Sequence, residues 1–203
     1  MVCRPLPSAR TLADLWSTRY RELYEDGDGG SLLPLSEAEG RVLDALTSEG
    51  GPVAHERLVY MAWALALAAE PTVLRHSPDE GRPARVLRRV EEQLRRSLLE
   101  AAPDLVTAFP STVVVPQALH ESLDTFRSLA RALDLIEARE AVESALDDCL
   151  EGYAVFPGAD GRRDLFNWWL TRVAPAAHSR RLPEEIYTML WPWPPPRRAG
   201  DGT

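Results

Sequence analysis

The hydrophobic positions of the chain recur mainly with helical spacing. In the first segment, residues 8–25, apolar side chains return every three or four positions and so share one face of a helix. This helix is expected to end at the acidic, glycine-rich residues 26–30, which we interpret as a linker. The apolar positions of the segment are Leu12, Leu15, Trp16, Tyr20 and Leu23.

A second helix is expected to begin at Ser36. Ser36 and Glu39 have the spacing of a capping box, in which the hydroxyl binds a free amide of the first turn and the carboxylate binds the amide of Ser36. Gly50, Gly51 and Pro52 should end this helix. Residues 70–82 are expected to form a long connection. Further helices are predicted over residues 54–69, 83–100, 117–135, 137–153, 161–173 and 182–190.

The predicted helix at residues 83–100 is amphipathic. Its apolar side chains recur at helical spacing and should face a core, while arginines occupy the opposite face. The apolar stripe consists of Leu87, Val90, Leu94 and Leu98, and the arginines opposite it are Arg85, Arg89 and Arg96.

The clearest β-strand signal follows this helix. Residues 105–109 (LVTAF) and 112–115 (TVVV) are rich in β-branched and aromatic side chains, and Pro110 and Ser111 between them suit a turn. We therefore expect a β-hairpin over residues 105–115.

These elements predict a mostly α fold, with a winged-helix-like domain that contains one short β-hairpin, followed by an all-helical domain. The length of 203 residues allows two small domains. The expected divisions are an N-terminal helix and linker at 1–33, the winged-helix-like domain at 34–116, an acidic helical domain at 117–191 and a proline-rich disordered tail at 192–203.

Composition narrows the choice of partners. The formal net charge is −8, which disfavours non-specific binding to nucleic acid. Positions 121–151 contain nine acidic residues and three basic ones, Arg127, Arg131 and Arg139. This acidic half of the chain should contact a partner protein or a second copy. The chain has only two cysteines and no signal-peptide pattern, so we expect a cytoplasmic protein. It has no apolar run of membrane length, so we expect no contact with a membrane.

The element order and several segments resemble a known family. Residues 35–46 (LSEAEGRVLDAL), 51–58 (GPVAHERL) with Trp63, 82–99 and 105–115 are similar to the winged helix of bacterial activators of the antibiotic-regulatory type. Residues 119–126, 140–146 and 153–169 are similar to the helical bacterial transcriptional activation domain that follows it there. The resemblance implies a bacterial transcriptional regulator that binds DNA.

In that family the arginine-rich helix enters the major groove and the hairpin tip meets the DNA backbone. Arg85 and Arg89 would then contact base edges, because arginine can bridge the two acceptors of guanine. The remaining arginines of the helix would meet phosphates, which give affinity without sequence information. The expected DNA-binding residues are Arg82, Arg85, Arg88, Arg89, Arg95 and Arg96.

Three features depart from the family and support an alternative. Residues 1–34 lack the usual N-terminal sheet, Glu91 and Glu92 interrupt the basic face, and the expected hairpin tip has no basic residue. The alternative is a non-enzymatic adaptor that keeps the shape but binds protein instead of DNA. DNA binding that weakens steeply with salt would separate the two hypotheses.

The sequence contains no recognisable catalytic or metal motif, so we expect no enzyme activity, no metal and no cofactor. The four histidines are scattered and are expected at the surface or at caps. Asp26, Asp28 and Glu37 match part of a calcium loop, but Ser31 replaces its glycine. Trp168 and Trp169 are expected in the core. The histidines are His55, His76, His120 and His178.

Overall fold

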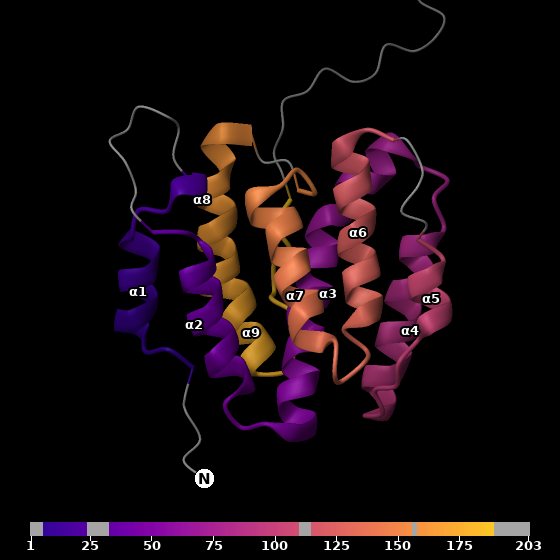
Figure 1. Ribbon diagram of the computed structural model, residues 1–203, viewed down its shortest axis with the longest axis horizontal. Helices are drawn as coiled ribbons and strands as arrows, with labels where there is room; N and C mark the ends of the chain where they lie inside the picture. Colours follow the sequence, from indigo (N-terminus) through magenta and orange to yellow (C-terminus); the bar gives the residue numbers. More distant parts are fainter. Residues whose placement is uncertain (1–5, 24–32, 110–114, 156–157, 189–203) are drawn as a thin grey trace, which may run out of the picture.

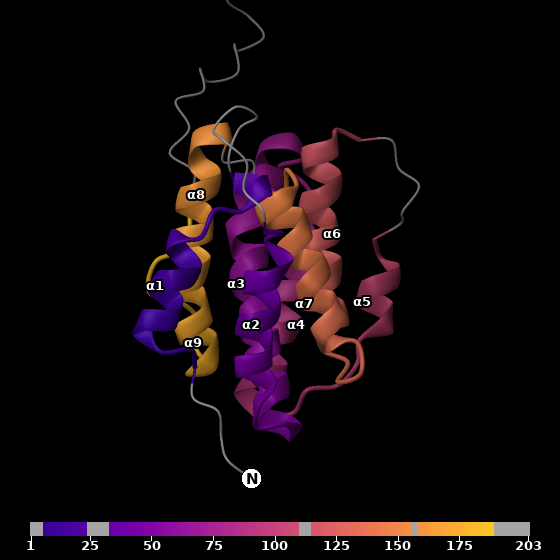
Figure 2. The ribbon, with the colours of Figure 1, turned by 60° about the vertical axis from the view of Figure 1, so that its left-hand side comes forward.

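The computed structural model describes residues 6–23, 33–109, 115–155 and 158–188, and helices make up most of this chain. The main helices run side by side along one direction, with α1 at one edge and α5 at the other (Figures 1 and 2). In chain order the elements are α1 (Ala9–Ser17), η1 (Arg21–Leu23), α2 (Ser36–Thr47), α3 (Gly51–His76), α4 (Arg82–Arg96), α5 (Pro103–Thr107), α6 (Gln117–Arg131), α7 (Ala138–Leu146), η2 (Asp147–Glu151), α8 (Gly158–Trp168), η3 (Trp169–Val173) and α9 (Ala174–His178).

Helix α3 lies in the middle of the molecule and contacts α2, α4, α6, α7 and α9. It begins where Gly50 and Gly51 take positive φ angles of 66° and 64°, which glycine adopts without the strain of a side chain. Many of its buried residues are alanines, and this small side chain favours helix and lets neighbouring helices approach closely. With 26 residues, α3 is long and apolar enough to cross a membrane, but two thirds of its most apolar window (67%) is buried in the protein.

The C-terminal helices form one nearly continuous rod. Helix α8 passes into η3 and then α9, and η3 is a π-helix, a wider turn with hydrogen bonds between residues five apart. Trp169 is fully buried, and its indole Nε1 donates to the sulfur of Met61 on α3 at 3.2 Å. Phe166 packs between the rings of Trp169 and Tyr20. The expected burial of Trp168 and Trp169 is confirmed, at 8% and 0% exposed.

The predicted β-hairpin is wrong, because no strand occurs in the part of the chain that the structure describes. Residues 103–107 form helix α5, with Pro103 at its first position and Asp104 in its first turn, both favourable places in a helix. Leu105 and Phe109 are four residues apart and both buried, so their spacing suits a helical turn as well as a strand. Residues 110–114 lie outside the described chain, and the described residues form an all-α fold.

Three local expectations also fail. The capping box does not form, since Ser36 is already helical and Leu35 at the cap position makes no side-chain bond to the helix. The expected connection at 70–82 is largely helix, because α3 continues through Pro71 to His76. Residues 182–188 are not helical.

The hydrophobic core is one cluster that extends from Leu15 to Ala177. It contains residues from α2, α3 and α4 together with residues from α6, α7 and η3. Side chains on both sides of residue 116, the expected domain boundary, thus share one core. The expected domain divisions remain a prediction.

Arg57 links α2, α3 and α9 inside the protein. Its Nε donates to the carbonyl oxygen of His178 at 2.9 Å, and Nη1 donates to that of Leu46 at 3.3 Å. Nη2 binds the carboxylate of Glu49 at 2.8 Å, and only 7% of the arginine side chain is exposed. A buried cation with three partners should join these helices firmly.

We expect Arg57→Met to lower the free energy of unfolding by roughly 3 kcal/mol, because it leaves two carbonyls and one carboxylate without their donor. Urea unfolding at neutral pH measures the change. Arg181→Met is the control, since Arg181 is 62% exposed and 3.9 Å from Glu184, and it should cost less than about 0.5 kcal/mol. Equal effects of the two substitutions would contradict this role of Arg57.

Candidate functional site

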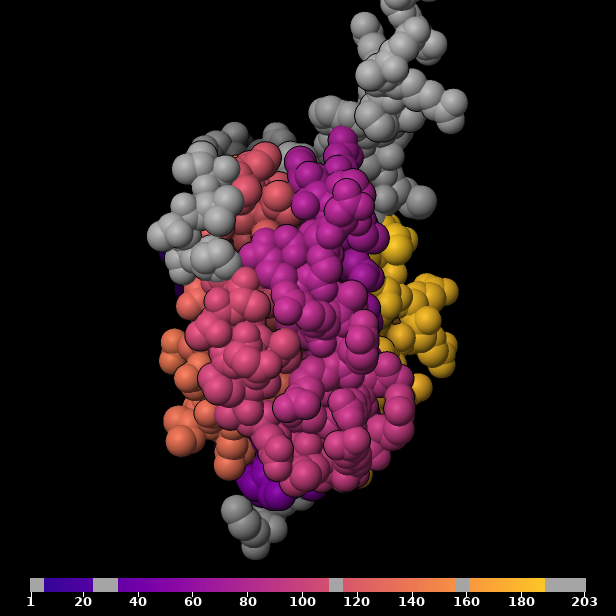
Figure 3. Space-filling view, turned by 90° about the vertical axis from the view of Figure 1, so that its right-hand side faces the viewer, coloured from indigo at the N-terminus to yellow at the C-terminus, as the bar shows by residue number. Residues whose placement is uncertain are grey.

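Helix α4 is held by one face and exposes the other. Pro83, Val86, Val90 and Gln93 are buried against the rest of the protein. The helix ends at Ser97, and the side chain of Gln93 secures the chain beyond it by bonds to the backbone N–H and carbonyl of Glu100, at 2.8 and 3.0 Å. The outer face of α4 is therefore presented on a fixed support. Figure 3 shows this side of the molecule, with α4 beside α5.

Arg82, an expected DNA-binding residue, is bonded within the protein. Its guanidinium binds the carboxylate of Glu80, donates to the carbonyl of Ala108 at 3.2 Å and lies over the ring of Phe109 at 5.3 Å. The hydrogen bonds from Arg82 lower the pKa of Glu80, and the same pairing raises the pKa of Arg82. Arg82 thus fastens the start of α4 to the end of α5.

The arginines at the C-terminal end of α4 are paired with glutamates on the same helix. Arg95 binds Glu91 at 2.7 Å and Arg96 binds Glu92 at 2.6 Å, each one turn apart. These pairs are exposed, so each contributes about 0–1 kcal/mol to stability. They neutralise the basic charge of this end locally.

Arg85, Arg88 and Arg89 differ from these three. All three side chains are exposed and, among the described residues, none of these side chains makes an ion pair or hydrogen bond. Their positions at i, i+3 and i+4 place them on one stripe of α4. With Glu92, Asp104 and Leu105 they line a shallow depression of about 240 Å³ between α4 and α5.

This depression is basic. The depression extends along the middle turns of α4, so its positive potential comes from the three guanidinium groups. Asp104 and Glu92 on the rim offset part of this charge. The site therefore suits a small number of carboxylate or phosphate oxygens more than a long polyanion.

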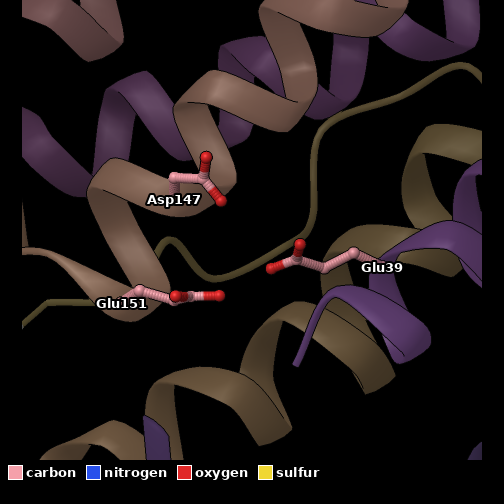
Figure 4. Close-up of side chains that lie close together, drawn as sticks. All are labelled: Glu39, Asp147 and Glu151. Atoms are coloured by element: carbon pink, nitrogen blue, oxygen red, sulfur yellow. The ribbon is translucent and has the colours of Figure 1, made fainter. Parts of the chain in front are cut away.

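A second polar cluster lies on the other side of α3, where α7 continues into the π-helix η2. Glu39 of α2 and Asp147 and Glu151 of η2 place carboxylate oxygens within 4.8 Å of one another (Figure 4). Glu39 is only 4% exposed, and its Oε1 has no hydrogen-bond partner among the described atoms. No spacing pattern in the sequence indicates this cluster, and Glu39 was expected to cap its own helix.

Burial raises the pKa of Glu39 to about 8, and the neighbouring carboxylates add to the shift. Asp147 acts most strongly among them, followed by Glu151, Glu22 and Glu143. The pKa values of Asp147 and Glu151 are also raised, in both cases chiefly by burial. The charge of Arg162 acts in the opposite direction and lowers the pKa of Glu151.

Asp148 points to the opposite side of η2. Burial raises its pKa to about 8, with Asp124 and Glu121 of α6 adding to the shift. Close packing fixes this turn, because a Cβ on Gly152 would lie 2.6 Å from the Glu121 carboxylate and 2.8 Å from the Asp148 carbonyl. The Glu121 carboxylate accepts a hydrogen bond from the Tyr153 amide. Cys149 between them is buried, which raises the pKa of its thiol.

The histidines do not all lie where expected. His55 is 6% exposed and its Nε2 lies 2.9 Å from the carbonyl oxygen of Ala132, so it is a buried residue that joins α3 to the end of α6. Burial lowers the pKa of His178, whose Nε2 has no hydrogen-bond partner among the described atoms. His120 lies 3.2 Å from Asp124 on the surface of α6.

No protein-family model, no curated protein and no solved structure matches this chain. The arginine face of α4 and the carboxylates around η2 are therefore judged on their own geometry.

We expect the free energy of unfolding to fall as pH rises from 6.5 to about 8. Glu39 and Asp148 have pKa values of about 8 when folded and ordinary values of 4.5 and 3.8 otherwise. The folded state thus binds protons that the unfolded state has released, and each group contributes a slope of up to about 1.4 kcal/mol per pH unit. Glu39→Gln should reduce this slope.

Urea unfolding at pH 6.5, 7.5 and 8.5 measures the effect. His178 contributes the opposite slope near pH 6.5, because its pKa is lowered in the folded protein while the unfolded histidine still binds protons, and this contribution fades above about pH 7.5. It is present in the parent and in Glu39→Gln alike, so the difference between their slopes reports Glu39. An unchanged slope in Glu39→Gln would contradict a shifted pKa at this position.

Proposed function

We propose that this protein is a non-enzymatic protein-interaction module whose α4–α5 depression binds an acidic segment of a partner protein. The observation that carries the proposal is that Arg85, Arg88 and Arg89 are exposed and lack ion pairs among the described residues, whereas Arg95 and Arg96 on the same helix are paired. An unpaired, preorganised set of guanidinium groups favours bidentate bonds to carboxylates.

Several features favour an acidic protein segment over DNA. Asp104 and Glu92 lie in the same depression as the three arginines and leave it a small excess of positive charge, which suits one or two carboxylates. The net charge of −8 repels the dense charge of a DNA backbone more strongly than that of a short acidic segment. Residues 105–107, expected in the first strand of the DNA-contacting hairpin, are helical instead. The depression of about 240 Å³ is also small, and it matches one or two acidic side chains.

A bacterial transcriptional regulator that binds DNA is the second candidate. The feature that favours it is the i, i+3, i+4 stripe of exposed arginines, which could reach base edges and phosphates from one helix. On this hypothesis Arg95 would also contact phosphate. Both candidates are proposed to act in the cytoplasm, and the acidic helices α6 and α7 offer a second surface for a partner or another copy.

The test is a titration of the full chain onto two fluorescent probes, an oligo-glutamate peptide and a double-stranded DNA, each at low and high salt. We expect the peptide to bind more tightly than the DNA at the higher salt. Arg85→Glu combined with Arg89→Glu should weaken peptide binding at least tenfold, about 1.4 kcal/mol, because two attractive contacts become repulsive.

Arg95→Glu is the matched control, since it reverses a charge on the same helix outside the depression. It should leave peptide binding within about twofold, a difference of roughly 0.4 kcal/mol. Tight DNA binding with steep salt dependence that both sets of substitutions abolish would instead favour the regulator. Binding of neither probe would contradict both candidates.

A further inference from the structure

The carboxylates of Glu39, Asp147 and Glu151 converge from two elements that are distant in the sequence. Glu39 belongs to α2, and its carboxylate points toward η2, where the other two carboxylates point back toward it (Figure 4). All three place an oxygen within 4.8 Å of the other two. This convergence is independent of the arginine face of α4.

Glu39 is the informative member of this cluster. Its side chain is almost completely buried, at 4% exposed, and Oε1 has no hydrogen-bond donor among the described atoms. Burying a carboxylate oxygen without a donor or a counter-charge is costly, and such groups in proteins usually bind a cation or a donor. The Glu39 carboxylate points toward two further carboxylates, which offer it no counter-charge (Figure 4).

The π-helix η2 explains how two of the carboxylates share one side. Asp147 and Glu151 are four residues apart, about one turn in this wider helix. The turn closes when the amide of Gly152 donates to the carbonyl of Asp147 at 2.8 Å. This turn requires glycine at position 152, because a side chain there would collide with the Asp148 carbonyl.

We propose that Glu39, Asp147 and Glu151 form a binding site for a divalent cation, with Ca²⁺ as the best fit. Carboxylate oxygens are the preferred ligands of hard cations, and three of them exceed the charge of one such ion. Ca²⁺ accepts carboxylates in a flexible geometry, whereas Mg²⁺ demands a near-ideal octahedron, so three carboxylates from two separate elements suit Ca²⁺ better. Asp147 is exposed, so water can complete the coordination.

Bound Ca²⁺ would join α2 to the end of α7. The ion would replace repulsion among three carboxylates with attraction to a common centre, so binding favours the folded protein. The site shares no residue with the calcium-loop pattern considered over residues 26–37.

The test is calorimetric titration of the full chain, freed of metal with a chelator, with Ca²⁺ alone and with Mg²⁺ alone, together with thermal unfolding. We expect one Ca²⁺ per chain, weaker binding of Mg²⁺, and a melting temperature that rises with Ca²⁺ concentration. Glu39→Gln should weaken Ca²⁺ binding at least tenfold and remove the rise in melting temperature. Glutamine has the shape of the protonated glutamic acid that the raised pKa of Glu39 favours in the metal-free protein, so this variant should fold.

Asp148→Asn is the matched control, because Asp148 is a buried carboxylate of the same turn that lies near α6 instead of Glu39. It should leave Ca²⁺ affinity within about twofold. The proposal is overturned if neither ion binds, if Glu39→Gln retains the affinity, or if Asp148→Asn loses as much as Glu39→Gln. Tighter binding of Mg²⁺ than Ca²⁺ would overturn the calcium assignment.

Discussion

The burial of α3 is the constraint on which the rest of the structure depends. This helix is apolar around most of its circumference, so it is stable only when other helices cover nearly all of it. Helices α2, α4, α6, α7 and α9 provide that cover, and the buried polar side chains of Arg57 and His55 on α3 have hydrogen-bond partners. Each surrounding helix is thus fixed on one face and free on the other.

The two candidate sites follow from this arrangement. Helix α4 uses its valines for the core, which leaves its arginines on the outside beside α5. The π-helix η2 places Asp147 and Glu151 toward α2 and Asp148 toward α6. Acidic groups therefore lie both between η2 and α2 and between η2 and α6. The resulting repulsion is a local cost that the surrounding core has to offset, and that cost is why a cation at Glu39 would matter.

Helical periodicity predicted most of the helices, including α2 and α6, and the burial of Trp168 and Trp169 was also expected. It failed where two structures share one pattern. Leu105 and Phe109 fit a strand or a turn of helix, and packing of Phe109 against Arg82 accompanies the helical form. Residues 70–82 were expected to form a connection, yet α3 continues through Pro71 to His76.

The sites were predicted less completely than the fold. The arginines of α4 were all found from the sequence, but sequence spacing could not separate paired Arg95 and Arg96 from unpaired Arg85, Arg88 and Arg89. Which arginine pairs with a glutamate depends on the side-chain conformations in the folded protein, and these are not encoded in the spacing alone. Glu39 and η2 are far apart in the chain, and no local pattern shows that one helix turns a carboxylate toward another.

Native-state hydrogen exchange, followed by NMR, tests the central role of α3 most directly. If α3 is the helix that the others require, its amides between Leu58 and Ala69 should exchange only through global unfolding, at the slowest rates in the protein. Those of α1 at the edge should exchange faster through local opening. Exchange of the central α3 amides at rates as fast as those of α1 would contradict the account.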